Sequence, residues 1–401
     1  MAVVWTLVLL CAYFRLLFRL VFGRAAIYPR CAPASHCARA CIVTGASSGI
    51  GKATAEILAL EGYHVVLAGR SLANLEKAAK ELHKTHEDLL LYPMVLDLCS
   101  VPSILSFVKS VEEWLGTTQV SLQLLVNNAG IFAATPQCTS DGYDRVVMTN
   151  YLGPYILTQL LLPKLQKSSH TARIVNVVSF THRSSRKLPS EFWKMLGKKK
   201  LDDEDNYRMA MTYEVSKLYE LLWTYQLHRK YLRVSVMAAD PGVVETKILR
   251  ELPWWLVQFA FMMLKGVFLL QSPRCGARAV VDAALAPMEV SGKYFFGGNG
   301  FTLPSSALSR DEKLAKRLWN LTEEAYAAIM ERYTAPSSNL FRRRFSGSPT
   351  LLRVDKYVAL GQAVRTGHCP RHLGTDVAQS VDTGSRAARR NAPAWRRQWE
   401  R

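Results

Sequence analysis

The sequence predicts an α/β protein built on a doubly wound parallel sheet of about seven strands. From residue 40 to about residue 300, short apolar runs rich in β-branched residues alternate with longer amphipathic stretches. Such alternation implies parallel strands joined by helices that cover both faces of the sheet. A length of 401 residues with 49% hydrophobic content also allows a large core, which excludes a small disulfide scaffold. The clearest strand candidates are 40–44, 64–68, 90–96, 121–127, 172–179 and 232–238.

The net charge of +19 is concentrated at the two ends of the chain. Residues 1–40 contain five Arg and no acidic residue, and residues 335–401 contain twelve Arg and one Lys against four acidic residues. This distribution favours membrane-surface or tail electrostatics and disfavours a nucleic-acid-binding core. We therefore expect no nucleic acid partner, although an Arg-rich tail that binds nucleic acid is one alternative.

The first 24 residues predict a membrane anchor. Residues 1–14 are uncharged, and the apolar run continues past Arg15 and Arg19. A helix over residues 1–22 would be about 33 Å long at ~1.5 Å per residue, enough to cross the hydrocarbon layer. The following basic residues place the rest of the chain on the cytoplasmic side. An interfacial amphipathic helix and a cleaved targeting peptide are the alternatives.

The remaining chain divides into three parts. Residues 25–39 form a basic linker, 40–334 form the catalytic domain, and 335–401, rich in Pro, Ser, Gly and Arg, form a largely disordered tail. The eight cysteines are scattered, which fits a reducing compartment. The cluster of Cys31, His36, Cys37 and Cys41 lacks the paired spacing of a zinc site, so we expect no metal.

A glycine-rich turn follows the first predicted strand and precedes a helical pattern. Glycines let the backbone approach a pyrophosphate closely, and the start of a helix offers amide donors and a positive dipole to the anion. The turn predicts a dinucleotide site that includes Thr44, Gly45, Ser47, Ser48, Gly49, Ile50 and Gly51.

The end of the second strand indicates which dinucleotide binds. An acidic residue there holds the adenosine ribose of NAD(H), whereas an arginine receives the 2′-phosphate of NADP(H). The sequence reads Ala68-Gly69-Arg70-Ser71, without an acid. NADP(H) is therefore favoured, with NAD(H) as the alternative and a solvated Arg70 as the plain explanation.

Tyr213 and Lys217 carry the predicted chemistry. They are four residues apart in a helical pattern, so their side chains share one face of the helix. An ammonium group beside a phenol lowers the phenol pKa, and the hydroxyl can then exchange a proton with a carbonyl or alcohol oxygen.

Three more stretches follow predicted strands: Asp97-Leu98, Asn127-Asn128-Ala129-Gly130 and Pro241-Gly242 with Thr246. With the turn and the Tyr-Lys pair, they make the chain resemble the short-chain dehydrogenase/reductase family over roughly residues 40–300. The resemblance implies a Rossmann fold and a catalytic tetrad of Asn150, Ser179, Tyr213 and Lys217. It also implies cofactor contacts at Asp97, Leu98, Asn128, Ala129, Gly130, Tyr213, Lys217, Pro241, Gly242 and Thr246.

In the family's pattern, Ser179 would hydrogen-bond the substrate oxygen and Lys217 would also bind the nicotinamide ribose. Asn150 would hold a water that relays protons to Lys217. Ser179 precedes Tyr213 by 34 residues, which is longer than in compact members. The resulting insertion at 187–211 resembles the membrane-associated retinol-dehydrogenase-like and X-linked members.

Residues 252–271 are rich in Trp, Phe and Met with one interior charge, Lys265. We expect a membrane-facing helix over the active site, with core packing and a second membrane span as alternatives. The sequence thus predicts an NADP(H)-dependent oxidoreductase for a lipophilic alcohol, aldehyde or ketone of the retinoid, steroid or polyprenoid class. We expect it at the endoplasmic reticulum membrane, with a homodimer as a family-based expectation. A non-catalytic, membrane-tethered dinucleotide-binding scaffold is the alternative.

Overall fold

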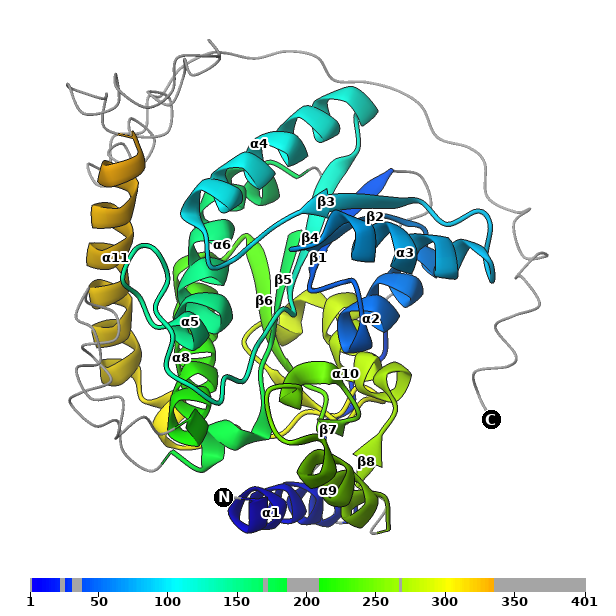
Figure 1. Cartoon of the computed structure of the whole chain (residues 1–401), viewed down its shortest axis with the longest axis vertical. Coiled ribbons are helices and arrows are strands. Elements are labelled where there is room, and N and C mark those ends of the chain that lie inside the picture. The colour runs from blue at the N-terminus through cyan, green and yellow to red at the C-terminus, as the bar shows by residue number, and fades with distance from the viewer. Residues whose placement is uncertain are drawn as a thin grey trace, which may run out of the picture. The chain divides into compact units, whose positions relative to one another are not determined.

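Seven parallel strands form one central sheet, as predicted, in the order β3-β2-β1-β4-β5-β6-β9 (Figure 1). The computed structural model describes residues 2–21, 26–30, 38–168, 172–185, 209–266 and 269–334. The strands are β1 Arg39–Thr44, β2 Tyr63–Gly69, β3 Leu91–Val95, β4 Ser121–Asn127, β5 Ala172–Val177, β6 Val234–Asp240 and β9 Tyr294–Phe296.

All described residues belong to one unit, Met1–Ala335. The predicted tail at 335–401 lies outside the described residues, as do part of the 25–39 linker and most of the 187–211 insertion.

The sheet is buried on both faces because its strands are apolar on both sides. In β1, Ala40 and Ile42 join one core cluster, whereas Cys41 and Val43 join the other. Alternate residues of a strand point to opposite faces, so a continuous apolar run fits a doubly covered sheet. The first face is covered by α4 Val101–Thr118, α6 Gly153–Gln166 and α8 Met209–Lys230, and the second by α2 Gly49–Leu60, α3 Leu72–His83 and α10 Pro273–Leu285. Helix α11, Glu312–Thr334, packs outside α8.

Two predicted strands differ from the observed ones by two residues at their ends. The strand expected at 172–179 ends at Val177, because Ser179 begins a short 3-10 helix, η2 Phe180–Arg183, and accepts the Thr181 amide. The strand expected at 232–238 runs from Val234 to Asp240 instead. Its predicted start fails because Leu232 lies in the turn after α8, where its side chain is 83% exposed.

The strand order reverses between β1 and β4: β2 and β3 extend the sheet on one side of β1, and β4, β5, β6 and β9 extend it on the other. In such sheets, ligands bind at the carboxyl ends of the strands next to this reversal. The glycine-rich turn after β1 and the segment after β4 both lie at this edge. The fold therefore brings the predicted dinucleotide site and the predicted catalytic residues to one edge.

Helix α1, Ala2–Val21, packs against this same edge. Ala12 and Leu16 are buried with Phe180, and Tyr13 accepts a 2.5 Å hydrogen bond from Gln271 of β8, Leu270–Gln271. Within the described ranges, no helix is both long and apolar enough to span a bilayer.

A buried histidine fixes the connection that follows β5. The Nδ1 atom of His182 lies 2.6 Å from the carbonyl oxygen of Ser179, and its Nε2 atom accepts the amide of Ser306 at 3.2 Å. The neutral ring can donate from Nδ1 and accept at Nε2. Burial, with a smaller contribution from Arg183, lowers the pKa of His182 to about 3.

We expect His182 to make the fold sensitive to acid. Below about pH 6.5 the unfolded chain binds a proton that the folded ring refuses, so stability present above this pH is lost as the pH falls toward 3. Replacing His182 with Gln should therefore flatten the dependence of the unfolding free energy on pH. Between pH 6.5 and 4.5, urea unfolding should show a wild-type loss about 2 kcal/mol larger than that of the variant. Equal slopes for the two proteins would contradict this assignment.

Candidate active site

Hydrogen bonds from the segment after β4 fix the position of the turn between β1 and α2. The buried hydroxyl of Thr44 accepts the amides of Asn128 and Ala129, each at 2.9 Å. The side-chain amide of Asn128 donates to the carbonyl of Thr44 at 2.7 Å. These bonds fix Asn128 and Ala129 against the glycine-rich turn, beside Gly130.

The glycines of this turn allow a close approach that a side chain would block. A Cβ atom on Gly51 would lie 2.4 Å from the carbonyl oxygen of Gly45, which itself has a φ of +69°. Ser48 precedes α2 but its side chain does not cap the helix, so the first amides of α2 stay available to an anion. Ser47 and Ile50, half-buried in the same turn, complete the expected set. This cradle fits a dinucleotide pyrophosphate.

The adenine side of the site lies at the ends of β2 and β3. Arg70 is exposed directly after β2. The backbone amide of Leu96 donates to the carbonyl of Gly69 at 2.9 Å, so Arg70 lies beside the start of the Asp97-Leu98-Cys99 segment. A Cβ atom on Gly153 would lie 2.4 Å from the carbonyl oxygen of Leu98, which fixes this segment against the start of α6.

Asn150 lies fully buried in a π-helical turn, η1 Met148–Leu152. Its Oδ1 atom accepts the Ile131 amide at 2.8 Å, and its Nδ2 atom donates to the Ile131 carbonyl and to Ser216 Oγ. The side chain therefore clamps the segment after β4. Turns of this type leave backbone groups outside the regular helical ladder and are frequent at functional sites.

Tyr213 lies on α8 with Ser179 and Lys217 around it. Burial raises the pKa of its hydroxyl, while Lys217 and a hydrogen bond with Ser179 lower it. The Lys217 Nζ atom lies 5.8 Å from the centre of the Tyr213 ring. The arrangement places a buried phenol beside a positive charge and a serine hydroxyl, groups that together can support proton exchange.

Lys217 is almost completely buried and connects Tyr213 to Asn150. Its Nζ atom donates to the carbonyl of Val177 at 3.0 Å. A Cβ atom on Gly130 would lie 3.5 Å from this Nζ atom and 3.6 Å from Asn150 Oδ1. The structure therefore brings the four tetrad residues together, as the resemblance implied.

The segment after β6 closes the site. The buried carboxylate of Asp240 accepts the Gly242 amide at 2.8 Å and the hydroxyl of Tyr294, and Gly242 has a φ of +74°. Thr246 lies against the glycine-rich turn, since a Cβ atom on Gly49 would be 3.4 Å from its methyl group. Pro241, Gly242 and Thr246 thus lie at the same edge as the turn.

Sequence reasoning missed two aromatic residues of the site. Trp5 of α1 and Phe132 contact the ring of Tyr213, with ring centres 6.1 and 5.6 Å away. The Nε1 atom of Trp5 donates to Glu214 at 2.5 Å. Trp5 lies more than 200 residues from Tyr213 in sequence, so no local pattern could have indicated this contact. These rings surround the Tyr213 ring with apolar surface.

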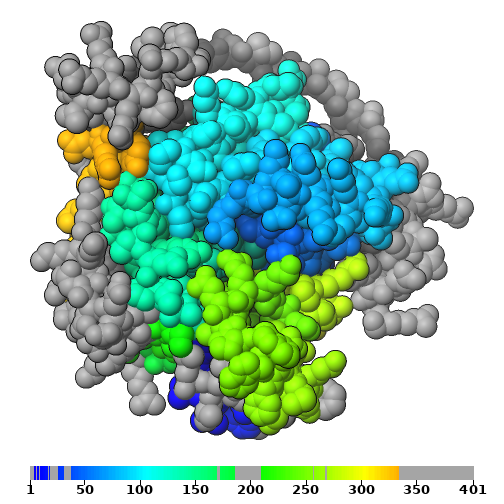
Figure 2. Space-filling model, in the orientation of Figure 1, coloured from blue at the N-terminus to red at the C-terminus, as the bar shows by residue number. Residues whose placement is uncertain are grey.

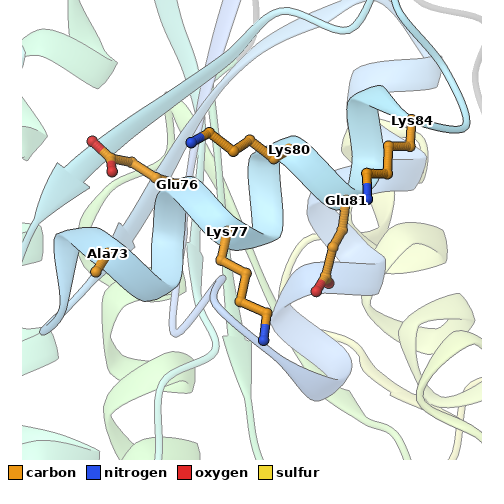
Figure 3. A pocket seen from close by; sticks show the side chains of 6 residues that line it. All are labelled: Ala73, Glu76, Lys77, Lys80, Glu81 and Lys84. Atoms are coloured by element: carbon orange, nitrogen blue, oxygen red, sulfur yellow. The ribbon is translucent and has the colours of Figure 1, made fainter.

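A hollow on the outer surface of α3 lies away from this chemistry (Figure 3). Its lining comes from one helix: Ala73, Glu76, Lys77, Lys80, Glu81 and Lys84. Glu81 pairs with Lys52 of α2. Alternating Glu and Lys side chains are typical of a solvated helix face.

Comparison with known proteins agrees with this geometry. Residues 39–188 match the short chain dehydrogenase family. Human retinol dehydrogenase 11 is 33% identical over 292 residues, which cover 70% of this chain and 83% of the relative. Human polyprenol dehydrogenase is 33% identical over 294 residues, with the same two coverages.

Solved structures share the fold. A protein of unknown function from Mycobacterium paratuberculosis has a TM-score of 0.56 and 27% identity, covering 73% of this chain and 95% of its own. A short-chain dehydrogenase/reductase from Caenorhabditis elegans has a TM-score of 0.52 and 21% identity over 65% of this chain and 94% of its own, which shows the fold alone. This chain belongs to the short-chain dehydrogenase/reductase family and is an NAD(P)-dependent oxidoreductase.

Proposed function

We propose that this protein transfers hydride between NADP(H) and a lipophilic alcohol, aldehyde or ketone, with retinoids and polyprenoids as the first candidates. The observation that carries the proposal is the position of Tyr213, whose hydroxyl bonds Ser179 and whose ring lies beside Lys217 and two aromatic rings. The relatives' names, retinol dehydrogenase and polyprenol dehydrogenase, support this substrate class.

Tyr213, Ser179 and Lys217 have separate roles in the proton transfer. A bound nicotinamide supplies or accepts the hydride. In the reducing direction, Tyr213 donates its hydroxyl proton to the carbonyl oxygen, and Ser179 hydrogen-bonds that oxygen as negative charge develops. Lys217 stabilises the resulting phenolate, since its ammonium lowers the pKa of Tyr213. Trp5 and Phe132 exclude water from this exchange.

Replacing Tyr213 with Phe should abolish turnover and leave NADPH binding intact. The change removes one exchangeable proton, and a loss of at least about 100-fold in kcat is expected for a missing general acid. Steady-state assays with retinal and a polyprenal would measure kcat, and NADPH fluorescence would measure the dissociation constant.

The control is Tyr225 to Phe on the same helix. This variant loses the hydrogen bond from the Tyr225 hydroxyl to Ser305 at 2.7 Å but should keep wild-type kcat. Wild-type kcat in the Tyr213 variant would contradict the catalytic assignment, and a wild-type protein that binds NADPH without any turnover would favour the scaffold alternative.

The preference for NADP(H) rests on Arg70. Its guanidinium group is exposed at the end of β2, and within the described residues it forms no ion pair. A free guanidinium at this position can receive a 2′-phosphate through two parallel hydrogen bonds.

Arg70 to Asp should therefore weaken NADPH binding by about tenfold or more, since it removes a charge-assisted contact, and should improve binding of NADH. Lys80 to Asp on α3 makes the same change of charge on an exposed helix face and should leave the ratio of the two dissociation constants unchanged. An unchanged ratio in the Arg70 variant would show that Arg70 is only a surface residue.

We further propose that α1 and α9 dock on a membrane. Helix α9, Trp254–Gly266, and α1 lie at the same end of the unit in Figures 1 and 2. Both carry large exposed apolar side chains: Val4, Leu7, Leu10, Phe14 and Phe18 on α1, and Trp254, Trp255, Phe259, Met262 and Met263 on α9. Exposed Arg15 and Lys265 suit anionic headgroups. This placement corresponds to the interfacial alternative; location at the endoplasmic reticulum and a homodimer stay predictions.

Replacing Trp254 and Trp255 together with Ser should weaken sedimentation with anionic liposomes. It should also raise the KM for a long-chain aldehyde delivered in liposomes, with little change for a short, water-soluble aldehyde that needs no lipid-side entrance. Leu232 to Ser removes an equally exposed apolar side chain from the turn after α8 and should change neither quantity. If the double variant keeps wild-type liposome binding and wild-type KM, α9 does not face lipid.

A further inference from the structure

A buried carboxylate lies one helical turn from Lys217. Glu220 of α8 is 1% exposed, and its Oε2 atom lies 2.7 Å from Lys217 Nζ. Among the described residues, no other donor contacts either carboxylate oxygen. An isolated charge in a protein interior is strongly unfavourable, so Glu220 and Lys217 depend on each other.

A chain of polar groups holds the backbone of Glu220 in place. Asn127 of β4 donates to Asn176 of β5 at 2.9 Å, and Asn176 donates to Thr224 Oγ1 at 2.8 Å. Thr224 Oγ1 in turn donates to the carbonyl of Glu220 at 2.6 Å. This network ties α8 to the central strands at the residue that pairs with Lys217.

Two ionisable groups of the same helix, Lys217 and Tyr213, interact with this carboxylate. Asp240 of β6 acts on both of these groups. The elements η1 and β5 contribute the uncharged amides of Asn150 and Asn176. The Lys217 ammonium therefore forms an ion pair with Glu220, donates a hydrogen bond to the Val177 carbonyl, and also lies near the Tyr213 ring.

We propose that Glu220 is a positioning residue that sets how strongly Lys217 acts on Tyr213. The ion pair fixes the ammonium group and neutralises part of its charge, so the proton affinity of Tyr213 depends on the carboxylate of Glu220 as well as on Lys217. This inference rests on the proposed function, since it concerns the proton exchanged by Tyr213.

The electrostatics around Tyr213 agree in sign. Burial raises the pKa of Tyr213, Lys217 lowers it, and Glu220 raises it again. Burial lowers the pKa of Lys217, while Glu220, Tyr213 and Asp240 raise it, with a net upward shift. Burial also raises the pKa of Glu220 against the opposing effect of Lys217. Removal of the carboxylate charge should leave an uncompensated ammonium group and a more acidic Tyr213.

The test is Glu220 to Gln, which keeps the shape of the side chain and removes its charge. In the oxidising direction Tyr213 must be deprotonated, so the acid limb of kcat/KM against pH reports its pKa. This limb should move to lower pH by about one unit in the variant. Glu220 to Asp, which draws the carboxylate back from Lys217, should move the limb in the same direction by less, and it serves if the Gln variant does not fold.

The matched control is Asp282 to Asn. Asp282 of α10 is also a buried carboxylate in an ion pair, with Arg30 at 2.7 Å. Its loss should lower the melting temperature and leave the acid limb in place. An unmoved limb in both Glu220 variants, or an equal shift in the Asp282 variant, would overturn the proposal.

A second readout does not need activity. Thermal unfolding of Lys217 to Met, Glu220 to Gln and the double variant forms a mutant cycle. Lys217 to Met alone leaves a buried carboxylate without a partner, so the double variant should melt at a higher temperature than this single variant. Additive changes would show that the two groups do not interact. If the wild-type protein oxidises neither retinol nor a polyprenol, the proposed function fails, whereas the cycle still tests the pair.

Discussion

The site depends on the connections after β1 and after β4, which leave the middle of the sheet toward opposite faces. The chain leaves β1 toward α2 on one face, and after β4 it continues to the opposite face, which α6 covers. Space therefore opens between neighbouring strand ends. Thr44 joins the two strand ends, because its hydroxyl accepts hydrogen bonds from two backbone amides of the segment after β4. The same segment continues to Ile131, which Asn150 of η1 clamps, so one stretch of backbone positions both the glycine-rich turn and Asn150.

The burial of Tyr213 and Lys217 has two opposite electrostatic effects. A low-dielectric surrounding makes the ammonium group of Lys217 far more effective on the phenol than it would be in water. The same surrounding makes that ammonium group costly to bury. Glu220 offsets this cost, and the Val177 carbonyl accepts a hydrogen bond from the ammonium group. The counter-charge that makes a buried lysine tolerable is thus also a charge that acts on Tyr213, the proposed proton donor.

The sheet and the glycine-rich turn were predictable because each is encoded by a local pattern. Asn150 and Ser179 were implied only by the family resemblance, and the catalytic roles of the four tetrad residues stay predictions. Apolar runs define buried strands, and the four-residue spacing of Tyr213 and Lys217 defines one helix face. His182 and Trp5 were not predictable, since their partners Ser306 and Tyr213 lie far away in sequence. Glu220 was visible as a residue, but a Glu three positions after a Lys usually marks a solvated helix face. Its burial comes from the sheet and from α11 packed outside α8.

Helix α1 illustrates a different limit. Lipid and a protein interior both exclude water, so an apolar run suits either environment. In the structure one face of α1 uses Ala12 and Leu16 to pack on the catalytic unit, while Phe14 and Phe18 on another face are exposed. Trp5 on the packed side touches Tyr213. If lipid covers the exposed face, as proposed, one helix diameter of about 10 Å would separate the bilayer from the reacting hydroxyl. A lipophilic substrate would then reach Tyr213 without passing through water, past the apolar rings that pack on the Tyr213 ring.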